Sequence, residues 1–136
     1  MDHDKRITPD NIIDIKDNEV FVFGSNLGGF HSKGAAKTAL TWGAKWRQAA
    51  GLQGRTYGIP TKDRTVKRVL SVIEIKPYVD EFIQFAINNP NLIFFCTEIG
   101  CGLSRYKPKD IAPLFIDAIN IENIHLPRRF WRILVK

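Results

Sequence analysis

The sequence predicts an α/β fold in which helices alternate with the strands of a mostly parallel sheet. Two short runs rich in β-branched and aromatic residues, at 19–23 and 92–97, have the composition of strands, and each leads into a glycine-containing segment. Between them lie two stretches with helical spacing of apolar residues. The run at 92–97 is the most apolar of all, as expected for a central strand that is buried on both faces.

The first strand, at residues 19–23, is followed by an alanine-rich stretch that predicts a helix over residues 35–50. This helix would place Trp42 and Trp46, four residues apart, on one face. Gly51 follows as a helix stop.

The next elements follow from the same signals. A second strand is expected at residues 55–59, ended by Pro60. A helix is expected over residues 77–88, because a proline fits its first turn and apolar residues line one face. The apolar strand at 92–97 precedes a last helix over residues 108–119. Strands therefore alternate with helices along the chain.

Length and composition set further limits. A chain of 136 residues, 44% hydrophobic and 25% charged, fits one globular domain spanning residues 1–136. No apolar run is long enough to span a membrane, and the N-terminus lacks an apolar signal region, so we expect a cytoplasmic protein with no membrane partner. Cys96 and Cys101 are then expected as free thiols. The net charge of +6 suits an anionic ligand or a polyanion.

Both strands lead into glycine-rich segments, at residues 24–36 and 97–106. Glycine lets the backbone approach a ligand closely, and helix starts offer unpaired N–H groups. Ligands of parallel sheets bind beyond the carboxyl ends of the strands, where both segments would lie. Neither segment is a P-loop or a dinucleotide-binding G-x-G-x-x-G motif. Two such loops facing each other predict a diphosphate clamp and a nucleotide-like ligand.

Three segments, at residues 23–36, 57–62 and 97–106, resemble in order and spacing the macro domain, the ADP-ribose-binding α/β/α module. The pairing of Pro60-Thr-Lys62 with Ile99-Gly-Cys-Gly-Leu103 is similar to the branch of terminal ADP-ribose glycohydrolases and of antitoxins that remove ADP-ribose from DNA. The string Val-Phe-Gly-Ser-Asn also resembles macro-like proteins of bacteriophages. The resemblance implies a three-layer α/β/α fold with a mixed, mostly parallel sheet.

The resemblance also implies a function: binding of ADP-ribose or a derivative, and hydrolysis of ADP-ribosyl links to protein or nucleic acid. It makes Lys62 a catalytic residue, which could attack the anomeric carbon or stabilise a leaving oxyanion. It implies that Asn26 contacts the distal ribose or orients the attacking water. The other interpretations are a solvated loop lysine or a purely electrostatic ligand contact for Lys62, and a turn cap for Asn26.

No cofactor is expected, and no Cys/His spacing predicts a metal site. The residues expected to contact the ligand come from the two glycine loops and from the strand that ends at Lys62. They are Gly24, Ser25, Gly28, Gly29, Lys33, Gly34, Ala35, Thr61, Gly100, Cys101, Gly102, Leu103, Ser104 and Tyr106.

Ser104 departs from the pattern of the glycohydrolase branch, which has an acid directly after Gly-Cys-Gly-Leu. A serine cannot act as a carboxylate general acid or base. Whether the chain is an enzyme therefore stays open, and the alternative is a non-catalytic binder of ADP-ribose-type or cyclic signalling nucleotides. A third alternative is a nucleic-acid-binding protein that uses the basic segments at 64–68 and 128–136.

Several residues keep two interpretations. His31 could meet a phosphate or lie at the surface. Cys101 could be a nucleophile or a small residue beside a phosphate. Tyr106 could stack on the ligand or pack in the core. Asp14 and Asp17 both lie where the family often has an acid that binds the adenine amine, and the sequence does not choose between them.

Overall fold

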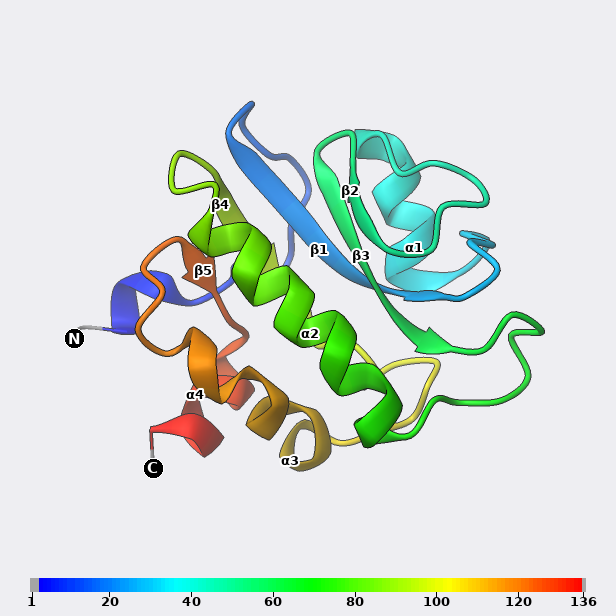
Figure 1. The fold of residues 1–136 in the computed structure, drawn as a ribbon. Coiled ribbons are helices and arrows are strands. Elements are labelled where there is room, and N and C mark those ends of the chain that lie inside the picture. Colours follow the sequence, from blue (N-terminus) through cyan, green and yellow to red (C-terminus); the bar gives the residue numbers. More distant parts are fainter. Residues whose placement is uncertain (1–2, 136) are drawn as a thin grey trace.

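A five-stranded mixed sheet with the strand order β2-β3-β1-β4-β5 forms the centre of the structure (Figure 1). The computed structural model describes residues 3–135. The central strand β1 pairs in parallel with β3 and β4, β5 pairs in parallel with β4, and only β2 is antiparallel. The prediction of an α/β fold with a mostly parallel sheet is therefore confirmed. The strands are β1 (Glu19–Asn26), β2 (Gly51–Gln53), β3 (Thr56–Lys62), β4 (Ile93–Cys96) and β5 (Ile124–His125).

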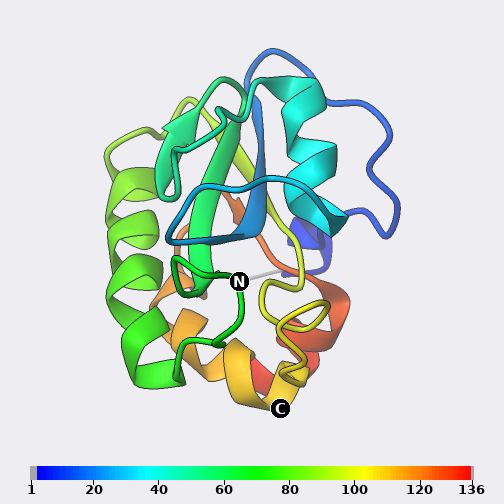
Figure 2. The same cartoon turned by 90° about the vertical axis from the view of Figure 1, so that its right-hand side faces the viewer.

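Helices lie on both faces of this sheet. Figure 2 shows α1 on one side and α2 on the other. The α-helices are α1 (Gly34–Ala39), α2 (Val72–Ile87), α3 (Pro108–Ile111) and α4 (Arg128–Leu134), and the 3₁₀ helices are η1 (His3–Arg6), η2 (Leu40–Trp42) and η3 (Ala112–Ala118). No helix within residues 3–135 is both long and apolar enough to cross a membrane.

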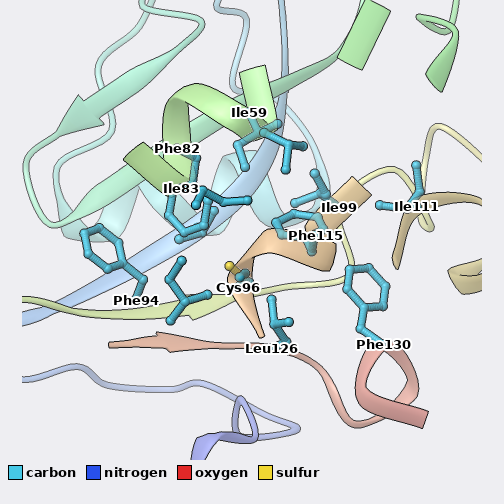
Figure 3. Packing of buried hydrophobic residues seen from close by; sticks show 14 of the residues in the cluster. Ile59, Phe82, Ile83, Phe94, Cys96, Ile99, Ile111, Phe115, Leu126 and Phe130 are labelled. Atoms are coloured by element: carbon cyan, nitrogen blue, oxygen red, sulfur yellow. The ribbon is translucent and has the colours of Figure 1, made fainter. Parts of the chain in front are cut away.

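Side chains of β1 alternate between two hydrophobic clusters. Val20 and Val22 belong to the larger cluster, with residues of α2, β4, η3 and α4, part of which is shown in Figure 3. Phe21 and Phe23 belong to the smaller cluster, with residues of α1 and η2. Because β1 is buried on both faces and paired on both edges, its position fixes where the neighbouring strands end.

The register of β1 and β3 brings the ends of the two strands together. Ser25 pairs with Pro60, and after an irregularity Asn26 pairs with Lys62. Pro60 therefore lies within β3, and the expectation that it ends the strand is wrong. The sheet is irregular at this point and β2 reaches no further along β3 than Gly58, so a residue without an N–H group is accommodated.

The helix expected over residues 35–50 is much shorter. It ends with η2 at Trp42, because Gly43 has φ +104° and passes close to Gly54. A Cβ atom added to Gly43 would lie 2.9 Å from the Gly54 Cα, so only glycine allows this contact. Trp46 consequently lies outside the helix and is 55% exposed, whereas Trp42 is buried.

The other two predicted helices also differ from expectation. Helix α2 begins at Val72 rather than at Pro77, because Ser71 and Glu74 form a capping box, with a hydrogen bond from Glu74 N to Ser71 Oγ and one from Ser71 N to Glu74 Oε1. Pro77 lies inside this helix. The helix expected over 108–119 is broken by a non-helical Phe115 (φ −99°, ψ 15°) within η3.

Arg6 connects the N-terminal segment to the C-terminal part of the chain. Its guanidinium donates hydrogen bonds to main-chain carbonyl groups at the end of η3 and after it, and its own carbonyl oxygen accepts a 2.8 Å hydrogen bond from Trp131 Nε1. The side chain is buried and its guanidinium lies 5.0 Å from the centre of the Trp131 ring. The acceptors are the carbonyl oxygens of Ala118, Ile119, Ile121 and Ile124.

We expect Arg6→Met to lower the free energy of unfolding by about 3 kcal/mol, because several buried carbonyl groups lose a charged donor. Lys5→Met is the matched control: Lys5 is the exposed neighbour, and its change should stay within about 0.5 kcal/mol. Urea unfolding followed by circular dichroism measures both. Equal changes in the two variants would contradict this role of Arg6.

Candidate functional site

A cavity of about 680 Å³ lies at the carboxyl ends of β1 and β3 and the segment after β4. Both glycine loops line it, and so do most of the residues that the sequence assigned to the ligand. These are Gly24, Ser25, Asn26, Lys33, Gly34, Ala35, Thr61, Lys62, Gly100, Gly102, Leu103 and Ser104. Further lining residues, which the sequence did not single out, are Phe30, Ser32, Ala36, Val66, Thr97, Glu98 and Ile99.

Lys62 is the last residue of β3, and its half-buried side chain lines the cavity. Its main-chain carbonyl accepts a 2.9 Å hydrogen bond from Leu27 N, which holds the strand end against the first glycine loop. Within residues 3–135 the Lys62 side chain has neither a hydrogen-bond nor an ion-pair partner. The amine is thus available to a ligand in the cavity.

The side chain of Asn26 closes the first glycine loop. Its Nδ2 donates to the Phe30 carbonyl and its Oδ1 accepts from Phe30 N, both at 2.9 Å, and the residue is only 6% exposed. These two bonds fix the turn that follows β1. The structure therefore shows a loop-closing role for Asn26, and its contact with a ribose or a water stays a prediction.

Ser104 and Thr61 form a hydroxyl–hydroxyl hydrogen bond at the base of the cavity. The two oxygens are 2.9 Å apart, and Thr61 Oγ1 also lies 3.3 Å from the Ser25 carbonyl, to which it donates. Both residues are buried. This contact ties the second glycine loop to the end of β3, and it places a neutral hydroxyl where the resembled branch has an acid.

The second glycine loop offers several unpaired main-chain donors to the cavity. Within the described part of the chain, no acceptor lies within hydrogen-bond reach of four of its N–H groups, and all four residues line the cavity. They are Gly100, Gly102, Leu103 and Ser104. A set of adjacent N–H groups without acceptors favours an anionic ligand.

The physical reason why a position is occupied by glycine differs among the glycines of the two loops. A Cβ at Gly28 would lie 2.4 Å from the Phe30 ring, and one at Gly29 would lie 2.4 Å from the Arg47 backbone. These two glycines are needed for packing of the loop and do not line the cavity. Gly102 differs, because nothing lies within 4 Å of an added Cβ and its φ is not positive. The packing of the chain therefore does not explain why Gly102 is a glycine.

Three other expected residues lie away from the cavity. Tyr106 donates a 2.6 Å hydrogen bond to the Leu70 carbonyl and packs against the larger hydrophobic cluster. His31 is fully buried, with Nε2 3.0 Å from the Gln48 carbonyl, so it is neither at the surface nor at a phosphate position in the cavity. Cys101 also does not line the cavity. Burial, followed by the charge of Glu98, raises the pKa of its thiol to about 11.

A second cavity of about 590 Å³ adjoins the first, and Ala35, Thr97 and Glu98 line both. Residues 8–12 and the start of α4 form much of the rest of its wall, together with Phe21, Thr38, Cys96 and Pro127. At the boundary the Glu98 carboxylate accepts two hydrogen bonds from the Arg129 guanidinium, including one of 2.7 Å from Nε, and this raises the pKa of Arg129.

The acidic residues before β1 are placed differently from expectation. Asp14 and Asp17 line neither cavity, whereas Asp10 lines the second. No sequence signal separates Asp10 from the other two, because only the path of residues 8–12 beside α4 brings it there. Within residues 3–135 no group of three or more His, Cys, Asp or Glu residues could hold a metal ion.

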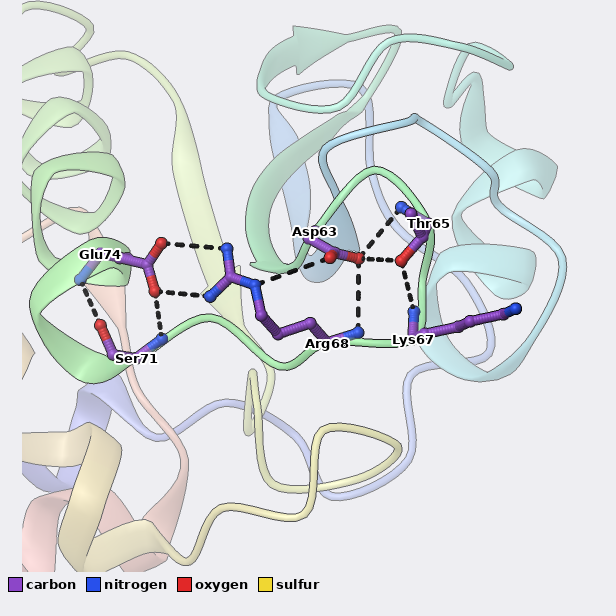
Figure 4. Close-up of polar contacts among 6 residues, drawn as sticks. All are labelled: Asp63, Thr65, Lys67, Arg68, Ser71 and Glu74. Atoms are coloured by element: carbon purple, nitrogen blue, oxygen red, sulfur yellow. Dashed lines mark hydrogen bonds and ion pairs between the residues drawn. The ribbon is translucent and has the colours of Figure 1, made fainter.

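The loop over residues 63–68 contributes one residue, Val66, to the wall of the first cavity and is held by polar contacts at both ends (Figure 4). The Asp63 carboxylate accepts hydrogen bonds from the Thr65 N–H (3.0 Å) and hydroxyl (2.6 Å). Arg68 pairs with Glu74 at 2.9 Å, and this hydrogen bond lowers the pKa of Glu74 to about 2. Val66 has φ +66°, an uncommon conformation for a β-branched residue, and it lines the cavity.

No protein-family model, no curated protein and no solved structure matches this chain. The fold and the site define an α/β protein with a ligand-sized cavity beyond the carboxyl ends of its parallel strands. The geometry of this cavity is the basis for the function proposed below.

The raised pKa of Cys101 gives a pH prediction. At pH 8 its thiolate fraction should be about two orders of magnitude below that of a free thiol, and its rate of reaction with Ellman's reagent should be at least about tenfold lower. The rate should rise about tenfold per pH unit from pH 7 to pH 10, since the thiolate is the reactive form. Cys101→Ser identifies the signal against the buried Cys96. A rate that levels off below pH 9 would contradict the burial of this thiol.

Proposed function

We propose that this chain is a macro-like protein with a three-layer α/β/α arrangement that binds ADP-ribose or a close derivative and hydrolyses ADP-ribosyl links to protein or nucleic acid. The observation that carries the proposal is that both glycine loops and Lys62 line one cavity. Its volume of about 680 Å³ lies within the range of small-molecule sites, and the adjoining cavity extends it.

In this proposal the diphosphate lies along the second glycine loop. The unpaired N–H groups of Gly100, Gly102, Leu103 and Ser104 supply donors, and Lys33 and Lys62, which line the same cavity, supply positive charge. The distal ribose lies toward Lys62. The base occupies the adjoining cavity beyond Glu98, where Asp10 lies within the wall. The absence of an internal reason for Gly102 supports a close approach of the ligand at that point.

Lys62 is the residue proposed to support the chemistry. Its amine can attack the anomeric carbon and displace the acceptor group, and water then releases ADP-ribose and regenerates the amine. Alternatively it remains a cation that stabilises the oxygen leaving from the anomeric carbon. In the covalent route the glycosylamine on Lys62 opens its ribose ring to an imine before water adds, and borohydride reduces this imine to a stable amine. Reduction therefore distinguishes the two routes, because only the covalent one leaves a mass increase on Lys62.

A non-catalytic binder is the second candidate, and one observation favours it. The hydroxyl of Ser104 is engaged with Thr61, and the one carboxylate among the residues that line the first cavity, Glu98, is paired with Arg129. No unpaired carboxylate is therefore available at the expected position for general acid or base catalysis. Measurements of ADP-ribose binding and of ADP-ribose release decide between the two candidates.

We expect the wild-type protein to release ADP-ribose from ADP-ribosylated DNA or protein, and Lys62→Ala to lower this rate at least about 100-fold. Lys33→Ala is the matched control, because it removes a second cation from the same cavity wall. It should weaken ADP-ribose binding without lowering the rate at saturating substrate. Binding without release by the wild type would favour the non-catalytic candidate, and no binding in calorimetry would contradict both.

Gly102→Val tests the ligand pose separately. The structure leaves open space at the Cβ position, so the melting temperature should change by no more than about 2 °C. ADP-ribose affinity measured by calorimetry should fall at least about tenfold, since the added side chain occupies space that the proposal gives to the diphosphate. Unchanged affinity in a folded variant would place the ligand elsewhere.

A further inference from the structure

Positive charge is concentrated in one part of the chain. Residues 20–62 contain six lysines and arginines and no aspartate or glutamate, which equals the formal net charge of +6 of the entire protein. This stretch includes β1 from its second residue, the first glycine loop, α1 and the strands β2 and β3. The rest of the chain is balanced in formal charge, so the excess positive charge that favours an anionic partner lies in this stretch.

An exposed tryptophan lies within this basic stretch. Trp46 is 55% exposed, while the other two tryptophans, Trp42 and Trp131, are 7% and 2% exposed. The segment that carries Trp46 is fixed in position, because Lys45 N donates to Gln53 Oε1 (2.7 Å) and Arg47 N donates to the Gly29 carbonyl (2.8 Å). The chain thus holds a large aromatic ring at its surface in an ordered segment.

The segment around Trp46 and the basic loop at 63–68 both contact the first glycine loop. The ring centres of Phe30 and Trp46 are 5.9 Å apart, and the Arg47 guanidinium lies 4.6 Å from the Phe30 ring centre. On the other side, Gly28 lies against both the Phe30 ring and the Arg64 carbonyl. Figure 2 shows the loop at 63–68 beside the first glycine loop.

The two segments therefore meet at the first glycine loop, and we define their exposed basic and aromatic side chains as the basic–aromatic surface: Lys45, Trp46, Arg47, Arg64 and Lys67. All five side chains are exposed. The cationic ends of Lys45, Arg64 and Lys67 have no carboxylate partner within the described residues, and the nearby Asp63 is engaged by Thr65 and Arg68.

We propose that this basic–aromatic surface binds single-stranded nucleic acid. Unpaired bases expose flat faces that can stack on Trp46, and the surrounding cations can neutralise the phosphates between them. A duplex hides its base faces, and an acidic protein surface would need the cations but not the ring. The inference does not depend on ADP-ribose binding, although a bound strand would lie next to the cavity that Phe30 and Val66 line.

Fluorescence anisotropy with fluorescein-labelled dT20 tests the proposal on the full chain. If four phosphates are neutralised, affinity should fall about 50-fold between 50 and 200 mM NaCl. Arg64→Gln/Lys67→Gln should reduce that loss to about sevenfold, because two of the four contacts are removed. Lys5→Gln/Lys16→Gln removes the same charge from exposed positions before β1 and should leave the salt dependence unchanged.

Trp46 variants test the aromatic contribution. Trp46→Ala should weaken binding about tenfold at each salt concentration with the same salt dependence, and Trp46→Phe should retain most of the affinity, because a phenyl ring also stacks. Binding should quench tryptophan fluorescence in the wild type, since only Trp46 is exposed.

Three results would overturn the proposal. The first is no binding of dT20 at 50 mM NaCl. The second is an equal loss of affinity in Arg64→Gln/Lys67→Gln and in Lys5→Gln/Lys16→Gln. The third is an affinity for poly-glutamate or duplex DNA equal to that for dT20, together with no effect of Trp46→Ala. Circular dichroism confirms that each variant is folded. Binding of dT20 without binding of ADP-ribose would support this inference and contradict the proposed function. Binding of ADP-ribose without binding of dT20 would contradict this inference and leave the proposed function standing.

Discussion

The parallel pairing of β1 with β3 on one edge and with β4 on the other is the constraint on which the rest of the structure depends. Parallel strands end at the same edge of a sheet, so this pairing brings the first glycine loop, Lys62 and the second glycine loop together although they are far apart in sequence. Burial of β1 on both faces fixes its register, because a shift by one residue would exchange Val20 and Val22 with Phe21 and Phe23.

Polar contacts then hold the loops in place around the cavity. The Asn26 side chain closes the first loop on Phe30, and the Thr61–Ser104 hydrogen bond joins β3 to the second loop. Asp63 and the Arg68–Glu74 pair order the loop that follows Lys62. Each of these groups is satisfied within the protein, whereas the Lys62 amine and the N–H groups of Gly100, Gly102, Leu103 and Ser104 have no partner among residues 3–135. These unpaired groups all belong to residues that line the cavity, where an anionic ligand could accept hydrogen bonds from them.

The basic–aromatic surface extends this arrangement beyond the cavity. The same glycines that let the first loop turn tightly, Gly28 and Gly29, also let the Arg64 carbonyl and the Arg47 backbone approach it. One loop thus positions both a cavity wall, through Phe30, and an exposed surface, through Trp46 and Arg47. A ligand in the cavity and a strand on the surface would contact opposite sides of the same segment.

The sequence by itself determined the α/β class, the strands at β1 and β4, and most of the cavity wall, because strand composition and the glycines after the strands are local signals. The start of α2 ahead of Pro77 also has a local signal, because Ser71 and Glu74 form the S-x-x-E pattern of a capping box. Only the tertiary structure decided that the contact of Gly43 with Gly54 stops the helix before Trp46. It also decided that Ser104 bonds Thr61, that His31 is buried, and that Asp10 rather than Asp14 lines a cavity. These features depend on contacts between residues distant in sequence, which no local pattern encodes.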